Sequence, residues 1–356
     1  MRGMIIVNSL YRDSLPPQAL SHLCELTDSS VSFTVSPGHA RHLARKAAES
    51  GADIVVAVGG DGTVNEVCNG LVGSSTALAV YPVGTANDLA RQMKISLQRM
   101  RACRNLAFCR LRPIDLIKVN GWHFVTVGGI GLPCEALQKM ENKRRLDRQT
   151  IPGTGYLRRF SYLQALLSLF RDIPYSRGEI EIKTERNGLI GEYISLLISN
   201  QPRVGHLFQV APDADNHDGL CDLMLLAPAK NRARSYLSVS TTLLPGNHRF
   251  ENIIRFRGRQ FLIILKQPVS FFADGEIPFS GRLFRIEVIP QALRVLVPPP
   301  LFSDRLDALR SPAIRPASPA SYQAESLISH STADLPLTIL RQKNSINQIL
   351  PSARGN

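Results

Sequence analysis

The chain has 356 residues and 44% hydrophobic content, which suffices for two moderate cores, and its length alone favours two domains. No run of about 18 apolar residues occurs, which excludes a membrane-spanning helix, and the four apolar residues after the basic start are too few for a signal peptide. The net charge of +13 favours an anionic membrane surface or a phosphorylated substrate, whereas 6% aromatic content without a dense basic tail argues against nucleic acid.

These properties predict a cytoplasmic protein that associates only transiently with the inner face of the membrane. The six cysteines include no CxxC pair and no dense spacing, so neither a zinc site nor a disulfide framework is expected. We expect most of them to be buried as small hydrophobic side chains.

The first third of the chain alternates strand-like and helix-like segments. Continuous apolar runs predict buried parallel strands, and apolar residues spaced three or four apart predict helices. A doubly wound sheet of this kind binds ligands at the carboxyl ends of its strands. The predicted strands are residues 4–7, 52–58 and 76–83, and the predicted helices are residues 39–50, residues from about 63 to 72, and a segment beginning near residue 87.

The pattern becomes mostly strand-like after residue 113, which predicts a second, β-rich domain. Its first two strands are expected to be joined by a turn at Asn120-Gly121. An insertion at 139–173 is first basic and then amphipathic, and the end of the chain is rich in Ser, Pro and Ala. The predicted domains are a nucleotide-binding domain at 1–118, a β-sandwich at 119–300, and a loosely ordered tail at 301–356, with a terminal helix in 337–350 as the alternative.

The stretch VAVGGDGTVNEVCNG (56–70) places Gly59, Gly60 and Gly62 between a strand and a helix. Glycine allows backbone N–H groups to approach a bulky anion, and a helix start directs further N–H groups to the same place. Asp61 would repel a phosphate unless a divalent cation lay between them or the carboxylate oriented a donor. The stretch therefore indicates a nucleotide bound with Mg²⁺.

A second stretch, YPVGTANDLARQ (81–92), repeats the arrangement after the next strand. Gly84 and Thr85 are expected to form the turn, and Asn87 and Asp88 lie where they could cap the following helix. Asp115 lies at the start of the β-rich part, and by itself it indicates no function.

Together these strings resemble the catalytic-domain family of diacylglycerol, sphingosine and ceramide kinases, most of all its bacterial soluble branch. GGDGT alone is shared with NAD kinases and phosphofructokinases, whereas PxGTxND and the later DGxxD separate this chain from them. The resemblance implies a doubly wound, NAD-kinase-like α/β domain, a C-terminal β-sandwich, and an active site in the cleft between them. The matching strings are GGDGTVNEV (59–67), PVGTANDLA (82–90), RPIDL (112–116), VGGIGLPCEAL (127–137), APDADNHDGLCDLMLL (211–226) and ADGE (273–276).

The resemblance also implies an activity and a set of site residues. The family transfers the γ-phosphoryl group of ATP to a lipid hydroxyl with Mg²⁺. Glu276 matches the proton acceptor, with Asp274 beside it, and Asp61, Asp88 and Asp115 match carboxylates linked to the catalytic Mg²⁺ through water. The Asp218 carboxylate and the carbonyls of Asp215 and Leu220 match a structural metal loop. The candidate nucleotide-binding residues are Asn8, Thr34, Gly59, Gly60, Gly62, Thr63, Asn65, Gly84, Thr85 and Asn87.

The chain departs from the family pattern after its first strand. The family usually has Asn-Pro and then a glycine-containing loop, whereas here VNSLYRD (7–13) keeps Asn8 but neither the proline nor the glycine. We expect weaker or differently shaped nucleotide contacts at this place. Arg12 is a candidate for a compensating phosphate contact.

The acceptor is left open between lipids. The first expected acceptor is diacylglycerol, and the second is a sphingoid base or ceramide. Two further alternatives are a catalytically weak homologue that binds lipid or nucleotide, and a kinase of a soluble acceptor such as NAD. A membrane-bound substrate requires docking on anionic lipid, for which cations at Lys143, Arg144, Arg145, Arg158 and Arg159 are candidates. A homodimer is also left open.

Overall fold

The structure is a computed structural model, and it describes residues 2–98, 102, 109–139, 177–185, 187–204, 208–231, 235, 238, 251–299 and 337–341. The chain divides into two compact units, Met1–Ile114 with Gln291–Asp334 and Asp115–Pro290 with Leu335–Asn356. The chain thus leaves unit 1 after Ile114 and returns to it at Gln291. None of the helices in the described ranges is long and apolar enough to cross a membrane.

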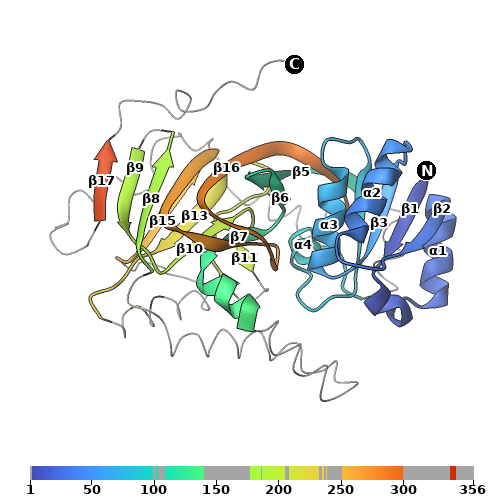
Figure 1. Ribbon diagram of the computed structural model, residues 1–356. Helices are drawn as coiled ribbons and strands as arrows, with labels where there is room; N and C mark the ends of the chain where they lie inside the picture. Colours follow the sequence, from blue (N-terminus) through green and yellow to red (C-terminus); the bar gives the residue numbers. More distant parts are fainter. Residues whose placement is uncertain are drawn as a thin grey trace. The chain divides into compact units, whose positions relative to one another are not determined.

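Unit 1 is built on a parallel sheet with the strand order β4–β3–β1–β2, coloured blue in Figure 1. The strands β3 and β4 are buried along their whole length, as their continuous apolar sequences predict. The last part of β16 lies parallel to β4, with Val295 opposite Leu78. The strands are β1 (Gly3–Val7), β2 (Ser29–Phe33), β3 (Ile54–Gly59), β4 (Ala77–Pro82) and β16 (Glu276–Val297).

Helices cover both faces of this sheet, which confirms the doubly wound prediction. Side chains of α1 pack with alternate residues of β1, β3 and β4, while α2 and α3 pack against each other and contact the sheet. A Cβ atom on Gly70 would lie 2.5 Å from the Arg41 carbonyl oxygen, so a glycine is needed where α3 approaches α2. The helical segments are the 3₁₀ helix η1 (Ser9–Ser14), α1 (Pro17–Thr27), α2 (His39–Glu49), α3 (Asp61–Leu71) and α4 (Asp88–Gln92).

Unit 2 consists mainly of antiparallel strands, with a helical segment at residues 132–139, and the buried side chains described there form two clusters. Strand β15 pairs with β7 through Phe271–Ala273 and with β8 through Phe261–Leu265, so it joins two sets of strands, β14–β13–β10–β7 and β9–β8. The larger cluster gathers residues from both sets, and the partly buried Phe279 packs against it with its ring stacked on that of Phe271. This arrangement confirms the β-sandwich. Its strands are β5 (Arg110–Val119), β6 (Trp122–Phe124), β7 (Val127–Gly131), β8 (Glu179–Thr184), β9 (Asn187–Glu192), β10 (Ser195–Ser199), β11 (Arg203–Val204), β12 (Phe208–Gln209), β13 (Cys221–Leu226), β14 (Ile253–Gly258) and β15 (Gln260–Ala273).

Two local predictions can be compared directly with the structure. Asn120 and Gly121 both have positive φ, 49° and 92°, and join β5 to β6 as the expected tight turn. In the C-terminal tail, Leu337–Arg341 forms the strand β17, which pairs antiparallel with β9. These five residues are therefore a strand and not part of the helix considered for 337–350.

Candidate functional site

The two predicted glycine turns touch each other at the carboxyl ends of β3 and β4. A Cβ atom on Gly84 would lie 2.4 Å from the Cα atom of Gly60, a distance that real Cβ atoms do not adopt. The Val83 N–H also donates to the Gly59 carbonyl at 3.0 Å. A glycine is thus required at position 84 by the contact between the two turns, in addition to any ligand that the turns approach.

Asp61 holds the second turn in place. Its Oδ2 accepts a hydrogen bond from the Asn87 N–H at 2.9 Å, and its Oδ1 accepts one from the Asp88 N–H at 2.6 Å. The helix α3 begins at Asp61, two residues earlier than expected, so the carboxylate lies in the first turn of the helix and not in the loop. The Asp61 carboxylate therefore orients backbone donors. This was one of the two explanations considered for it from the sequence, the other being a divalent cation beside the phosphate.

The second turn is closed by its own asparagine. Asn87 has a φ of 51°, and its side chain accepts from the Gly84 N–H at 3.0 Å and donates to the Gly84 carbonyl at 2.8 Å. The sequence suggested that this side chain could cap α4, but it makes no capping hydrogen bond. The N–H groups of Asn87 and Asp88 donate to the Asp61 carboxylate instead. Thr85 is exposed at the tip of the turn, and Asp88 is half-buried in the first turn of α4.

The ends of β1 and β2 are tied to the same region. Asn8 Nδ2 donates to Thr63 Oγ1 at 2.8 Å, and Thr34 Oγ1 accepts from the Ser9 N–H at 3.3 Å. Asn65 is buried, and its carbonyl and Oδ1 both accept from Asn69 Nδ2, so its side-chain oxygen bonds within α3. The structure thus brings Asn8, Thr34 and Thr63 together with the glycine turns.

The start of α3 offers backbone donors at this edge of the sheet. The Val64 N–H is the donor to the Gly60 carbonyl at 3.1 Å. In an α-helix the N–H groups of the first turn point out of its N-terminal end, here towards the glycine turn that precedes the helix. An 11-residue helix with glycine before it can bind a phosphate group at this end.

The segment after β1 is a short helix and not a glycine loop. Residues Ser9–Ser14 form η1, and Asn8 Oδ1 caps it by accepting from the Leu10 N–H at 3.0 Å. The Arg12 guanidinium lies 4.5 Å above the Phe33 ring centroid. Arg12 is therefore engaged by an aromatic side chain, and the structure gives no support to its role as a phosphate contact.

In unit 2, Asp274 is buried and fixes the backbone of residues 125–127. Its Oδ2 accepts from the Val125 N–H at 2.8 Å, and its Oδ1 accepts from the Thr126 N–H at 2.8 Å, the Thr126 hydroxyl, and the Val127 N–H at 3.3 Å. Asp274 and Gly275 have positive φ, 46° and 86°, and form the turn from β15 into β16. This turn places Glu276 as the half-buried first residue of β16, paired with Ala273.

Asp115 lies in unit 2 and not in the unit that holds Asp61 and Asp88. It is fully buried, and its Oδ2 accepts from the Gly219 N–H at 2.7 Å. Its backbone carbonyl accepts from Asn200 Nδ2 at 2.8 Å, and the same amide donates to the Val125 carbonyl at 2.9 Å. Asn200 therefore connects Asp115 to the segment that Asp274 holds.

The predicted metal loop already contains an ion pair. Asp218 Oδ1 accepts from the Leu220 N–H at 2.9 Å, and its Oδ2 pairs with the Arg257 guanidinium. Burial raises the pKa of Asp218. Burial also raises the pKa of Asp222, to about 6; the carboxylates of Asp218 and Asp213 add to this shift, and Arg257 opposes it. Asp215 is exposed beside them.

A hard cation would relieve the repulsion among these carboxylates. One carboxylate with two backbone carbonyls suits Mg²⁺, although Arg257 would then have to leave Asp218. No cluster of three His, Cys, Asp or Glu side chains suited to a metal occurs in the part of the chain described.

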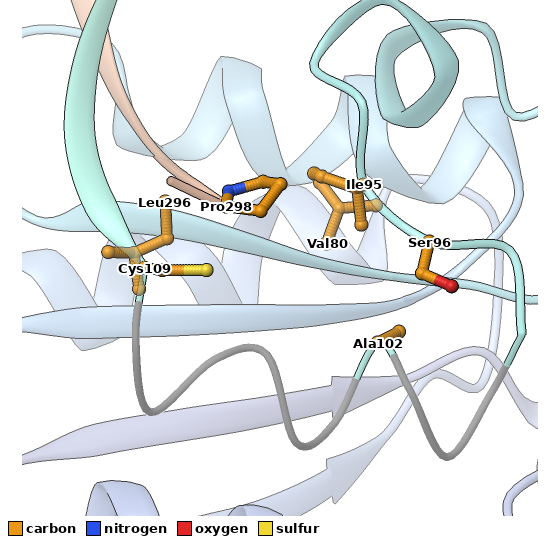
Figure 2. A pocket seen from close by; sticks show the side chains of 7 residues that line it. All are labelled: Val80, Ile95, Ser96, Ala102, Cys109, Leu296 and Pro298. Atoms are coloured by element: carbon orange, nitrogen blue, oxygen red, sulfur yellow. The ribbon is translucent and has the colours of Figure 1, made fainter. Parts of the chain in front are cut away.

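A small apolar pocket in unit 1 contains none of the predicted site residues. Its lining combines side chains of β4 and β16 with Cys109 (Figure 2). Burial raises the pKa of the Cys109 thiol to about 11. The lining residues are Val80, Ile95, Ser96, Ala102, Cys109, Leu296 and Pro298.

Cys109 should consequently react slowly with thiol reagents in the folded protein. A pKa of about 11 in place of 9.0 lowers the thiolate fraction at pH 8 about 100-fold. Iodoacetamide labelling followed by peptide mass spectrometry should show a rate that rises about tenfold per pH unit towards pH 11. In urea the same thiol should react at an ordinary rate. Equal rates in folded and unfolded protein at pH 8 would contradict the pKa shift.

The expectation that most cysteines are buried can be compared with the five cysteines that the structure describes. Cys68, Cys134 and Cys221 are buried, while Cys24 and Cys109 are partly exposed, and all five are free thiols. The cationic candidates of the basic insertion, from Lys143 to Arg159, lie outside the described residues.

Three residues with clear roles were not found from the sequence. Glu66 accepts from the Gly38 and Ala40 N–H groups at 2.9 and 3.0 Å and holds the start of α2. Thr126 and Asn200 carry the network between Asp274 and Asp115. Glu66 is contained in the string GGDGTVNEV, but its partners lie 26 and 28 residues away, and only the fold brings them together.

Comparison with known proteins gives consistent results for both units. Residues 7–119 match the model of the diacylglycerol kinase catalytic domain, and residues 145–297 match that of the YegS C-terminal NAD kinase beta sandwich-like domain. The chain is 31% identical over 262 residues to a diacylglycerol kinase of Bacillus subtilis, covering 72% of this chain and 81% of that protein. It is 33% identical over 274 residues to a probable lipid kinase YegS-like of Pseudomonas aeruginosa strain PAO1, covering 76% and 84%. A crystal structure of a diacylglycerol kinase from Bacillus anthracis matches the fold with a TM-score of 0.62 at 17% identity, covering 84% of this chain and 97% of that one.

Proposed function

Because this chain belongs to the diacylglycerol kinase catalytic-domain family of lipid kinases, we propose that it transfers the γ-phosphoryl group of ATP to the free hydroxyl of diacylglycerol, which gives phosphatidic acid. As a lipid kinase it is a phosphotransferase that uses ATP. The observation that supports the proposal most directly is the pair of interlocked glycine turns at the ends of β3 and β4, in a chain 31% identical to a named diacylglycerol kinase.

The described residues suit the separate tasks of phosphoryl transfer, which depends mainly on positioning and on stabilising charge. The amide groups at the start of α3 would bind phosphate oxygens. Asp61 would keep the second turn against the first by its bonds to the N–H groups of residues 87 and 88. Glu276 would accept the proton of the lipid hydroxyl, since it stands half-buried at the end of a turn that Asp274 fixes.

Mg²⁺ is part of the proposal as the ion that neutralises the phosphate charge. Asp88 is the candidate carboxylate beside the glycine turns, because both oxygens of Asp61 already accept backbone N–H groups. A second Mg²⁺ would use the Asp218 carboxylate with the carbonyls of Asp215 and Leu220. This second site would stabilise the loop whose Gly219 N–H bonds Asp115.

The acceptor is tested by a screen of the purified protein with labelled ATP and Mg²⁺. Diacylglycerol, monoacylglycerol, ceramide and sphingosine would be presented separately in mixed micelles, and the labelled lipids separated by chromatography. Diacylglycerol should be labelled fastest. Preferential labelling of ceramide or sphingosine would replace the proposed acceptor, label on NAD without lipid would indicate a soluble acceptor, and no transfer to any acceptor would favour a binding protein of the same fold.

A further inference from the structure

The helix η1 is fixed at the edge of the glycine turns by three independent contacts. Asn8 joins its start to α3 through Thr63 Oγ1, and the Ser9 N–H joins it to the end of β2 through Thr34 Oγ1. Arg12, at its far end, is placed over Phe33. This segment therefore has a defined position beside the turns and is not a loosely attached loop.

Tyr11 is the residue of η1 that reaches the glycine turns. Its N–H donates to the Asn8 carbonyl at 2.8 Å, but its φ of −115° and ψ of 15° depart from helical values and turn the chain at this residue. The Tyr11 hydroxyl lies 3.6 Å from the position that a Cβ atom on Gly60 would take, and the Gly84 Cα atom lies 3.2 Å from the same position. The hydroxyl thus adjoins the place where both turns meet.

We propose that the Tyr11 hydroxyl donates a hydrogen bond to the phosphate chain of the bound nucleotide, and so takes over a contact that a glycine-rich loop would provide through its backbone. This inference rests on the proposed function of the same site. A phenol is a neutral donor on a side chain with few rotatable bonds, which suits a fixed position at an anion. The half-buried ring is held by η1, and the remaining candidate on this helix, Arg12, is directed to Phe33.

The test is the substitution Tyr11→Phe, which removes only the hydroxyl. Isothermal titration of ATP, ADP, AMP and adenosine, with Mg²⁺ present, should show a Kd for ATP about tenfold higher than that of the wild type, since the lost hydrogen bond is to a charged group. Adenosine should bind both proteins equally, which a general loosening of the site would not produce. Tyr193→Phe, the same chemical change in the core of unit 2, should leave every Kd unchanged.

The possible results separate the inference from the function on which it depends. A wild-type protein that binds ATP, together with a Tyr11→Phe variant that binds it equally well, would overturn the inference alone. Tighter ATP binding by Tyr11→Phe or Tyr11→Ala would also overturn it, because the ring would then be obstructing the site. A wild-type protein that neither binds ATP nor phosphorylates lipid would overturn the proposed function, and the role of Tyr11 with it.

Discussion

Replacing Asp274 with alanine should lower the free energy of unfolding by about 3–5 kcal/mol and remove lipid phosphorylation, because several buried donors would lose their acceptor at once. The carboxylate accepts from three backbone N–H groups and one hydroxyl of residues 125–127, in a site where Asp274 itself is 7% exposed. A buried N–H without a partner costs about 1–3 kcal/mol. The loss of activity would follow from the turn that Asp274 sets, which positions Glu276.

Urea unfolding monitored by circular dichroism measures this effect, and Asp53→Ala provides a matched control. Asp53 Oδ2 also accepts a backbone N–H, from Arg2 at 2.8 Å, but the bond is exposed. Its loss should cost less than about 1 kcal/mol, because water can replace the acceptor. Asp274→Asn should lie between the two, since one side-chain oxygen remains. Equal midpoints for Asp274→Ala and Asp53→Ala would show that the observed bonds do not carry the predicted energy.

The sequence predicted the two glycine turns better than it predicted the hydrogen bonds that the carboxylates make. Apolar runs followed by glycine and helix patterns were sufficient to place both turns, because these signals are local. The partners of Asp61 lie 26 and 27 residues away, and those of Asp274 lie 147 to 149 residues away. Such contacts depend on strand order and on which backbone N–H groups remain unpaired, and neither property is visible in a single sequence.

Weak local signals account for the elements that were missed. The strand β2, SSVSF, has only two apolar residues, and it is recognised as a strand only through its parallel pairing with β1. The helix α1 lacks a side-chain N-cap, and η1 occupies a place where the resemblance implied a loop. The strands β5 and β16 each run from one unit into the other, so no change of composition marks the limits of the units.

The substitution Glu276→Gln should reduce kcat for lipid phosphorylation by about 10²–10⁴-fold, because it removes the group proposed to accept the hydroxyl proton. Glutamine has nearly the same shape and can still pair at the first position of β16, so the turn at residues 274–275 should persist. The Kd for ATP should be unchanged, since the nucleotide contacts are assigned to the turns after β3 and β4. A loss confined to kcat would separate a chemical role of Glu276 from a positioning role.

Glu287→Gln offers the matched control on the same strand. Glu287 is exposed on β16 and lies opposite Gln260, so its substitution should change neither kcat nor stability measurably. Single-turnover transfer of labelled phosphate and ATP titration on all three proteins would make the comparison. If Glu276→Gln kept kcat within about threefold of the wild type while Glu287→Gln also remained active, the proton would have to be accepted by another group. Asp274 would be a poor substitute in that case, because its two oxygens already accept four hydrogen bonds and its orientation is fixed by residues 125–127.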